Sequence, residues 1–218
     1  MTTTTWARIF AGLYQPLLWG GERAGMRELR RDLLTQARGR TLEIGGGTGL
    51  NLAHYPADVD LVLTEPDPSM RARLRRVAGD RAEVVDAPAE HLPVPDASVD
   101  TVVSTLVLCT VDGPDRALRE VARVLRPDGR LLFLEHVRSE SPALARRQDR
   151  AAAAWQRFAV GCRCNRATVE LIEACGFRVD ARTATWTAMP RILQPLVLGR
   201  ATVAVQAEAT RTAEAAPS

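Results

Sequence analysis

The residues most suited to chemistry form a glycine-rich turn in the stretch "RTLEIGGGTGLNLAHYP", residues 40–56. The turn follows an apolar run that ends at Ile44, and its glycines are Gly45, Gly46, Gly47 and Gly49. A ligand can pass close to such a backbone because no Cβ atoms stand in its way. If a helix begins after the turn, free N–H groups in its first turn favour a ligand with hydrogen-bond acceptors.

Two acidic residues accompany the turn. Glu43 lies two residues before Gly45, and Glu65 lies 20 residues after it in "LVLTEPDPSM". An acid at the end of the second strand of a β-turn-α-β unit is placed to accept hydrogen bonds from ribose hydroxyls. The turn and the acid therefore predict a ligand that carries a ribose. Dinucleotide-binding enzymes also need glycine at the position of Leu50, so a nicotinamide cofactor is not expected.

The elements that would position this turn alternate along the chain. Apolar runs of strand length alternate with amphipathic patterns, which is typical of a mostly parallel α/β sheet with helices on both faces. We expect seven strands, near residues 40–45, 60–64, 82–85, 99–105, 130–135, 177–187 and 199–207. We expect helices at residues 22–37, 48–54, 67–77 and 114–125, and a further helix that ends at Gly176.

The length of 218 residues suits a single domain. We expect a helical cap at residues 1–37, the main domain at 38–207 and a flexible tail at 208–218. An Ala- and Arg-rich insert at 138–165 interrupts the alternation and is expected to contribute to a substrate pocket. The sequence predicts no particular oligomeric state.

Composition excludes several classes of ligand. The net charge is +3, and every basic residue is arginine. The densest basic run, "RARLRR", falls on an expected amphipathic helix and is interpreted as a solvated face, so nucleic acid is not expected as a partner. The four cysteines lie far from the three histidines, and the spacing of Cys162 and Cys164 does not suit zinc, so no metal site is expected. Reduced thiols predict a cytoplasmic location.

The N-terminal stretch "WARIFAGLYQPLLW" has two interpretations. Helical spacing places Trp6, Phe10, Leu13 and Tyr14 on one face. An interfacial membrane helix usually carries a strongly charged opposite face, whereas this stretch has only Arg8. We therefore favour a cap that packs on the domain, with peripheral membrane contact as the alternative. No apolar run reaches the ~20 residues of a membrane span.

Four segments between about residues 38 and 137 resemble one protein family: "LEIGGGTG", "EPDPSM", "APAEHLPVPDASVDTVVSTLVLCTV" and "ALREVARVLRPDGRLLFLEH". They resemble the class I S-adenosylmethionine-dependent methyltransferases of the subgroup called type 11. The segments "TLVLCTV", "LEHV" and "GCRCNR" are most similar to the animal microsomal alkyl-thiol methyltransferases and their bacterial relatives. The resemblance implies a single-domain, Rossmann-like methyltransferase fold, with S-adenosylmethionine as the cofactor and S-adenosylhomocysteine as the product.

The resemblance also implies a cofactor site. Its residues would be Glu43, Gly45, Gly46, Gly47, Gly49, Asn51, Glu65, Pro66, Ala89, Glu90, Thr105 and Leu106. The glycines would pass under the methionine and ribose parts of the cofactor, and Glu65 would bind the ribose hydroxyls. Glu43 would orient the turn or meet the cofactor's amino group. Ala89 and Glu90 would flank the adenine.

Two further positions near the cofactor follow from the resemblance. Thr105 and Leu106, directly after the fourth expected strand, would line the methionine side near the sulfonium. Many relatives carry Asp where this chain has Pro88, two residues after Asp86. Backbone groups or Asp86 would therefore receive the adenine amino group.

Methyl transfer from a sulfonium needs little beyond placement, because holding the nucleophile about 3 Å from the methyl group supplies much of the acceleration. A base is needed only if the acceptor arrives protonated. His136, at the end of the fifth expected strand, is a candidate base for a thiol; alternatively, its ring orders a loop or packs over the substrate mouth. Cys109 is interpreted as an apolar filler rather than a nucleophile, since no histidine accompanies it.

The acceptor pocket is expected from the least regular parts of the chain. Its candidate residues are Tyr14, Trp155, Phe158, Trp186, Met189, Ile192 and Leu193. Each could instead be a core residue, but together they argue against a highly charged acceptor. Three functions stay open: methylation of a small, fairly apolar molecule, preferentially a thiol; methylation of a phospholipid head group or quinone; and cofactor binding without catalysis.

Overall fold

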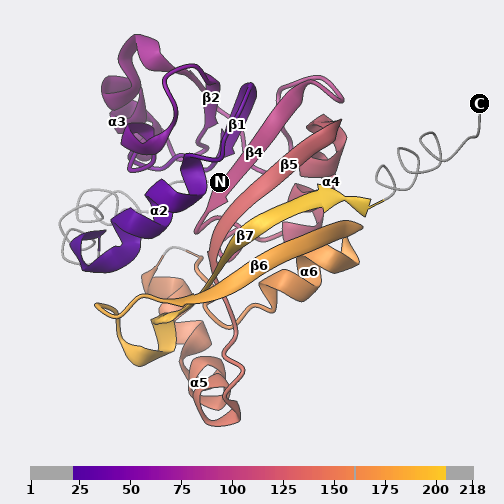
Figure 1. The fold of residues 1–218 in the computed structure, drawn as a ribbon. Coiled ribbons are helices and arrows are strands. Elements are labelled where there is room, and N and C mark those ends of the chain that lie inside the picture. The colour runs from indigo at the N-terminus through magenta and orange to yellow at the C-terminus, as the bar shows by residue number, and fades with distance from the viewer. Residues whose placement is uncertain (1–21, 160, 205–218) are drawn as a thin grey trace, which may run out of the picture.

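A seven-stranded sheet runs through the protein, and the computed structural model describes residues 22–159 and 161–204 (Figure 1). The strands are β1 (Arg40–Ile44), β2 (Asp60–Thr64), β3 (Glu83–Val85), β4 (Val99–Thr105), β5 (Leu125–His136), β6 (Phe177–Thr185) and β7 (Pro195–Val203). Their order in the sheet is β3-β2-β1-β4-β5-β7-β6. Neighbours are parallel except that β7 runs antiparallel to β5 and β6. The predicted mostly parallel, seven-stranded α/β fold is confirmed.

Five α-helices in the described part of the chain connect and cover the strands. They are α2 (Arg27–Leu34), α3 (Pro68–Ala78), α4 (Pro114–Val124), α5 (Pro142–Phe158) and α6 (Thr168–Ala174). The start of α3 shows how local sequence defines an element: the Asp67 carboxylate accepts hydrogen bonds from the backbone N–H groups of Ser69 and Met70, and Pro68 occupies the first turn. Shorter helical turns occur at Glu22–Met26, Leu52–His54, Gly79–Arg81 and Arg191–Leu193.

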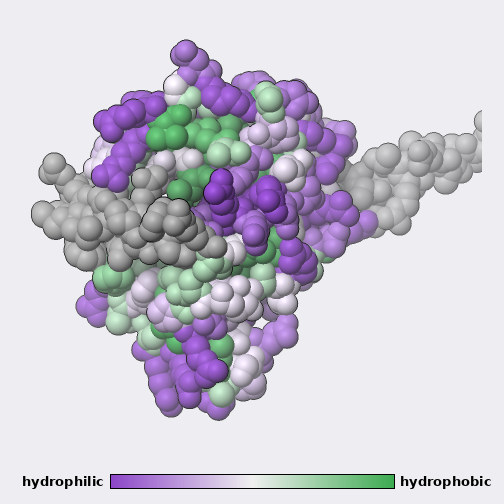
Figure 2. All heavy atoms as spheres, turned by 60° about the vertical axis from the view of Figure 1, so that its left-hand side comes forward, coloured by the Kyte–Doolittle hydropathy of each residue, from purple (hydrophilic) through white to green (hydrophobic). Residues whose placement is uncertain are grey.

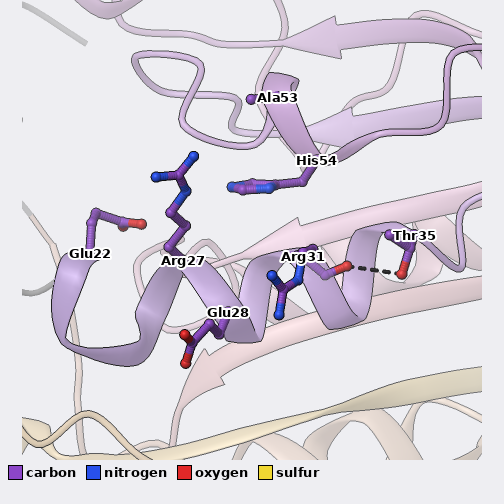
Figure 3. A pocket seen from close by; sticks show the side chains of 7 residues that line it. All are labelled: Glu22, Arg27, Glu28, Arg31, Thr35, Ala53 and His54. Carbon is purple, nitrogen blue, oxygen red and sulfur yellow. Dashed lines mark hydrogen bonds between the residues drawn. The ribbon is translucent and has the colours of Figure 1, made fainter.

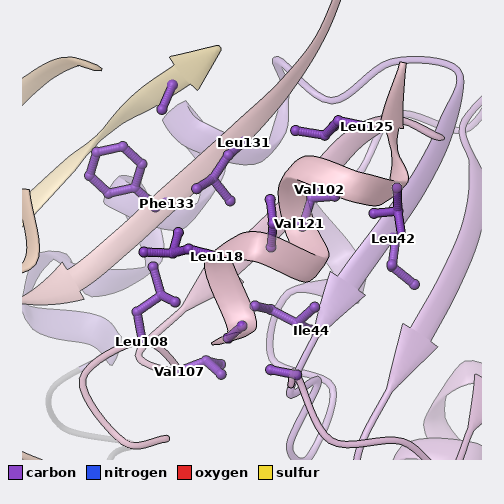
Figure 4. Packing of buried hydrophobic residues seen from close by; sticks show 14 of the residues in the cluster. Leu42, Ile44, Val102, Val107, Leu108, Leu118, Val121, Leu125, Leu131 and Phe133 are labelled. Atoms are coloured by element: carbon purple, nitrogen blue, oxygen red, sulfur yellow. The ribbon is translucent and has the colours of Figure 1, made fainter. Parts of the chain in front are cut away.

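Alternating side chains on the strands build two apolar cores, one on each face of the sheet. Leu131 and Phe133 of β5 belong to one core, and Leu132 and Leu134 belong to the other. Successive strand residues point to opposite faces, so the unbroken run "LLFL" fills both cores. The first core includes side chains of α4, such as Leu118 (Figure 4), and the second includes side chains of α2 and α3. Burying one such Leu or Phe side chain contributes about 1.5–3 kcal/mol.

The strand order reverses between β1 and β4. From β1 the chain proceeds outward through β2 to β3, and it then returns to the other side of β1 to form β4. Ligands of open parallel sheets bind at the carboxyl ends of the strands at such a reversal. Ile44 at the end of β1 lies beside Ser104 near the end of β4. The glycine turn and Thr105 therefore meet at the edge where a ligand is expected.

Two expected helices are shorter in the structure. The helix expected at residues 48–54 is only the turn Leu52–His54, because Gly49 has a φ of 87°, which a right-handed helix cannot contain. The helix expected at 22–37 becomes regular only from Arg27, because Gly25 has a φ of 106°. The predicted insert at 138–165 contains the 17-residue helix α5.

Two strands begin earlier than expected. The segment "RPDG", residues 126–129, lies inside β5 rather than before it, and the pairing of β5 with β4 changes register between Val99 and Thr101. Strand β7 begins at Pro195, because its pairing with β6 extends back to Thr185.

Some expectations concern residues outside the described part of the chain. The N-terminal stretch at residues 6–19 and the tail at 208–218 lie there, so they stay predictions. Among the described residues, no helix is both long and apolar enough to cross a membrane. On the face shown in Figure 2, the hydrophobic residues outside the grey atoms form small groups between hydrophilic ones.

Candidate functional site

The glycine turn is shaped by two different requirements. A Cβ atom on Gly45 would lie 2.7 Å from Val107 Cγ2, and one on Gly46 would lie 2.9 Å from Leu74 Cδ2, so these glycines allow the turn to pack on the core. A Cβ atom on Gly47 would meet no atom of the described residues closer than 3.9 Å, the distance to the carbonyl oxygen of Gly45. Gly47 has a φ of 57°, and its open side is the place where a ligand can run along the backbone.

Two N–H groups of the turn are already hydrogen-bonded to the end of β2, and no helix starts at the turn. Gly46 N donates to Thr64 O at 2.8 Å, and Gly47 N donates to Glu65 Oε2 at 2.8 Å. The expectation of a helix start that offers N–H groups to a ligand is therefore wrong for this turn. Thr48 is buried, and its hydroxyl has no hydrogen-bond partner among the described residues. This hydroxyl and the open side of Gly47 fit a polar ligand such as the predicted cofactor.

Glu65 connects the turn to the end of β2. Its Oε1 accepts a hydrogen bond from Asp67 N at 2.8 Å, while Oε2 accepts the bond from Gly47. The residue is 5% exposed, and burial raises the pKa of its carboxyl although the two backbone bonds lower it. Each carboxylate oxygen has a second lone pair, so the group can hold the turn and still accept from ribose hydroxyls.

Glu43 is locked inside the protein. Its Oε1 accepts a hydrogen bond from Asn51 Nδ2, and its Oε2 accepts one from the Tyr55 hydroxyl, both at 2.8 Å. Burial raises the pKa of the Glu43 carboxyl, and burial together with that carboxylate raises the pKa of Tyr55 well above its usual value. Because Glu43 is 2% exposed and both oxygens bind side chains of the protein interior, the geometry favours the first of the two predicted roles, which is to orient the turn.

A buried arginine joins this network from the preceding helix. Arg30 of α2 is 3% exposed, and its Nη1 donates to Asn51 Oδ1 at 2.7 Å and to Thr105 Oγ1 at 3.3 Å. Its Nε forms an ion pair with Glu22 Oε1 at 3.2 Å. Asn51 Nδ2 also donates to Thr105 Oγ1 at 2.8 Å. Arg30 therefore connects α2 to Asn51, which follows β1, and to Thr105, which ends β4.

Sequence reasoning did not identify Arg30, Tyr55 or Thr48 as members of the site. One signal was present for Arg30: it lies three and four residues before the buried Leu33 and Leu34, on the apolar face of its helix. A charge on such a face needs a buried partner. Neither Tyr55 nor Thr48 carried a comparable signal.

Leu106 has a conformation that is rare for residues with a side chain. Its φ is 59°, which costs roughly 1–2 kcal/mol outside glycine. The backbone N–H of Leu106 donates to Leu134 O at 2.8 Å, which holds it beside the end of β5. Strain of this kind concentrates at functional sites. Leu106 follows Thr105 directly, so both predicted cofactor residues lie at this edge.

The residues predicted to bind adenine lie in the loop between β3 and β4. Ala89 is buried, and Glu90 Oε1 accepts a hydrogen bond from Gly113 N at 3.2 Å. Asp86 is exposed and pairs with Arg71, whose Nη2 lies 2.8 Å from Oδ2. Arg71 Nη1 also donates to the carbonyl oxygen of Pro66 at 2.9 Å. The adenine contacts, including the loop at Pro88, stay predictions.

His136 is packed into the core. It is 4% exposed, and its ring is stacked on that of Trp186 with centroids 6.0 Å apart. Burial lowers the pKa of the imidazole to about 4, and Nδ1 has no hydrogen-bond partner among the described residues. A ring with this pKa is a weak proton acceptor for a thiol. The geometry therefore favours the packing alternative over the predicted base.

The predicted acceptor residues fall into two groups rather than one. Trp155 and Phe158 of α5 have ring centroids 5.6 Å apart, and Phe158 is 46% exposed. Trp186 is 1% exposed and belongs to the second core, against which Met189 packs. Leu193 is fully buried and Ile192 partly so, whereas Tyr14 lies outside the described residues. Trp186 is thus a core residue, and among the described candidates Phe158 is the most exposed apolar side chain.

Cys109 is a buried thiol beside a second thiol. It is fully buried, and its Sγ lies 3.9 Å from Cys162 Sγ. The Cys162 thiol and burial together raise the pKa of Cys109 well above its usual value. The thiol therefore stays protonated, as expected for a filler rather than a nucleophile.

A cavity of about 570 Å³ lies between α2 and the Leu52–His54 turn (Figure 3). It is lined by Glu22, Arg27, Glu28, Arg31, Thr35, Ala53 and His54. Arg27 and His54 point toward the space between the two elements, and burial followed by the Arg27 charge lowers the pKa of His54. The described part of the lining is mostly charged and differs in character from the apolar pocket that the sequence predicts.

Comparison with known proteins places these features in a wider group. The sequence pattern of the family described as "Methyltransferase domain" matches residues 42–133. Thiol S-methyltransferase TMT1B of Homo sapiens is 34% identical over 167 residues, which cover 70% of this chain and 68% of that protein. The ubiquinone/menaquinone biosynthesis C-methyltransferase UbiE of Hahella chejuensis is 38% identical over 123 residues, or 52% of this chain and 49% of that one.

A solved structure shows the same fold. The crystal structure of a SAM-dependent methyltransferase from Thermotoga maritima, described as a possible histamine N-methyltransferase, superposes with a TM-score of 0.70. The match covers 90% of this chain and 97% of that chain at 22% sequence identity. At this identity the likeness concerns the fold alone.

Proposed function

Because the chain belongs to the class I S-adenosylmethionine-dependent methyltransferases, we propose that it methylates the sulfur of a small, fairly apolar thiol. The observation that carries the choice of a thiol is the similarity to a thiol S-methyltransferase over 70% of this chain. The methyl donor follows from the family, with S-adenosylhomocysteine as the product. The acceptor rests on the relative's substrate, so it is the part that needs testing.

The residues of the glycine turn have distinct proposed roles. Bound S-adenosylmethionine supplies an electrophilic methyl group on its sulfonium. Gly47 leaves room for it along the backbone, and Glu65 accepts from its ribose hydroxyls. Glu43 and Arg30 keep Asn51 and Thr105 in place through the buried network. A rigid site of this kind suits a reaction that is accelerated by positioning.

We propose that the acceptor thiol ionises without help from a side-chain base. A thiol with a pKa of about 8.5 is a few per cent thiolate at neutral pH, and thiolate is the nucleophile. The pKa of His136 is about 4, so its imidazole would be too weak a base to remove the proton of a thiol efficiently. Its burial against Trp186 supports a role in packing beneath the acceptor side.

The surroundings of the acceptor are proposed from the described residues of the C-terminal half. Trp155 and Phe158 offer partly exposed aromatic rings at the end of α5, which suits a small apolar molecule. All four cysteines are free thiols, which supports a cytoplasmic location. Nucleic acid is not proposed as a partner. In the basic run on α3, Arg75 and Arg76 are exposed, whereas the side chain of Arg71 is 12% exposed and pairs with Asp86.

A second candidate function is methylation of a quinone. The similarity to UbiE, at 38% identity over 123 residues, favours it. A phospholipid head group is the related alternative if the N-terminal stretch meets a membrane. Both acceptors are larger than a small thiol and would need apolar surface beyond the α5 pair.

A panel of acceptors decides between these functions. Thiols, phenols, quinones and phospholipid vesicles are each incubated with the enzyme and methyl-labelled S-adenosylmethionine. We expect label on apolar thiols, and less label with Glu65→Ala at low donor concentration, because this variant should bind the donor more weakly. Turnover of a quinone or phospholipid without turnover of any thiol would reject the thiol proposal. No turnover at all, despite binding of S-adenosylhomocysteine, would favour a binding module.

A further inference from the structure

Glu135 is a buried acid that no part of the sequence analysis singled out. It is the second-last residue of β5 and is fully buried. Its Oε1 accepts hydrogen bonds from Ser104 Oγ at 2.7 Å, Val107 N at 3.0 Å and Leu108 N at 3.1 Å. Its Oε2 accepts one from Cys109 N at 3.1 Å. Four uncharged donors thus converge on one carboxylate.

Three of these donors are consecutive backbone N–H groups of the loop after β4. Successive N–H groups that face one anion form a nest, and this loop is wrapped around the carboxylate of Glu135. The carbonyl groups of the same loop are held from another side, because Arg166 Nη1 donates to Leu108 O and, at 3.0 Å, to Val111 O. Without the carboxylate, three buried N–H groups would lose their acceptor.

The loop held in this way begins at the predicted cofactor edge. Thr105 and Leu106 directly precede the three N–H donors, and Leu106 has the strained φ of 59°. Thr105 Oγ1 accepts hydrogen bonds from Asn51 and Arg30, the residues of the glycine-turn network. A change in the loop would therefore reach the turn through Thr105, and also through Val107, which lies against Gly45.

We propose that Glu135 is a positioning residue for methyl transfer, whose carboxylate fixes the loop after β4 so that Thr105 and Leu106 keep the geometry that donor binding requires. The proposal rests on the proposed function, since it assumes that this edge binds S-adenosylmethionine. Glu135 itself touches no ligand and acts through the loop. Cys109 and Cys162 are the titratable neighbours on that side, and Arg166 is the nearby cation.

The charge of Glu135 is as important as its shape. A carboxylate offers acceptors on both oxygens, whereas the amide of Gln offers one oxygen and an NH₂ group that is a donor only. In Glu135→Gln the NH₂ group would face at least one backbone N–H, so a donor would meet a donor. An isosteric change should therefore disturb the loop without creating a cavity.

The test compares Glu135→Gln with Asp100→Asn. Asp100 lies at the start of β4, at the opposite end of the strands from the cofactor edge. Its Oδ2 accepts a hydrogen bond from Arg40 N at 2.8 Å, and its Oδ1 pairs with Arg126 at 2.6 Å. Both changes replace a carboxylate that accepts a backbone N–H by its amide. Amide hydrogen exchange of residues 105–110, calorimetric binding of S-adenosylhomocysteine and the melting temperature are measured for each.

We expect Glu135→Gln to speed exchange in the loop and to weaken S-adenosylhomocysteine binding, each by about tenfold or more, with lower kcat for any acceptor found. Asp100→Asn should lower the melting temperature and change neither loop exchange nor binding. If Glu135→Gln only lowers the melting temperature and leaves binding and loop exchange unchanged, Glu135 is structural and the proposal is overturned.

Two further outcomes are informative. If Glu135→Gln does not fold, Ser104→Ala replaces it, since this change removes one of the four donors and keeps the carboxylate. Faster loop exchange with binding weakened a few-fold would support the proposal, and unchanged values would overturn it. If the wild-type protein binds no S-adenosylhomocysteine, the proposed function fails and this proposal fails with it. Normal wild-type binding together with unchanged variant binding would reject only the role of Glu135.

Discussion

The carboxylate of Glu65 accepts a hydrogen bond from the backbone N–H of Gly47 at 2.8 Å, so the acid after β2 holds the glycine turn after β1. The two motifs that the sequence places 18 residues apart are thus one structural unit. A ligand that meets the open side of Gly47 also meets the acid that stabilises the turn. Changes at Glu65 should affect both the ligand and the turn.

Replacing Glu65 by alanine should weaken S-adenosylmethionine binding by at least about tenfold. Each charge-assisted hydrogen bond to a ribose hydroxyl is worth about 1.5–3 kcal/mol, and the turn also loses its acceptor. Calorimetry on the wild type and the variant measures the change. Asp60→Ala is the control, because this exposed residue begins the same strand at its other end. Equal affinity in wild type and Glu65→Ala would place the ribose elsewhere.

S-adenosylhomocysteine should raise the melting temperature, whereas NAD and NADP should leave it unchanged. A ligand that binds only the folded state stabilises it in proportion to the logarithm of its concentration over its dissociation constant. Leu50 occupies the position where dinucleotide-binding turns need glycine, so a nicotinamide dinucleotide should not be accommodated. Thermal melts at several concentrations of each ligand test this. Stabilisation by NAD but not by S-adenosylhomocysteine would contradict the assigned donor.

Replacing Arg30 by methionine should lower the free energy of unfolding by about 3 kcal/mol. Removing one partner of a buried ion pair leaves an uncompensated charge, here that of Glu22, and it also removes the donors to Asn51 and Thr105. Urea denaturation measures the loss. Arg31→Met is the matched control: its side chain is 62% exposed, so the change should stay within about 0.5 kcal/mol. Similar effects of both changes would show that the buried network contributes little.

The sequence could locate Glu43, Gly47 and Glu65 because short-range geometry connects them. A strand, a tight turn and the next parallel strand bring these positions to one edge in any fold of this class. Arg30 could not be located in the same way, because its contact with Asn51 depends on how α2 packs against the sheet. The helix expected at 48–54 failed for a different reason. The sequence there has a helical period, but the positive φ of Gly49 excludes a regular helix.

The acceptor side was the least predictable part. The aromatic residues Trp155 and Trp186 look alike in sequence, yet the first lies at the end of an outer helix and the second is a core residue beneath His136. Composition alone cannot separate a pocket from a core, since both are apolar. Glu135 illustrates the same limit for polar residues, because its four donors come from the end of β4 and the loop after it, 26 to 31 residues earlier in the chain.

The pKa of His136 predicts how stability changes with pH. A histidine whose pKa falls from 6.5 to about 4 on folding binds protons more readily when unfolded, so its contribution to stability is present above about pH 6.5 and is lost as pH falls toward 4. The full contribution is about 3 kcal/mol. In His136→Gln this pH dependence should disappear. Urea denaturation at pH 7.5 and pH 4.5 measures the free energy of unfolding of both proteins. The contributions of the buried acids cancel when the two proteins are compared. An unchanged slope would mean that the ring is charged or solvated.

The rate of thiol methylation should rise about tenfold per pH unit until the pKa of the thiol is reached, because only the thiolate attacks. If the acceptor ionises unaided, His136→Gln should show the same pH profile as the wild type. In both proteins the profile should shift only when the thiol is replaced by one of different pKa. Steady-state rates with two thiols, measured from pH 6 to pH 9 on both proteins, supply the comparison, and Trp186→Phe controls for loss of the ring stack. A rate loss in His136→Gln that is confined to low pH and is absent in Trp186→Phe would restore His136 as the base, since a base matters most where thiolate is scarce.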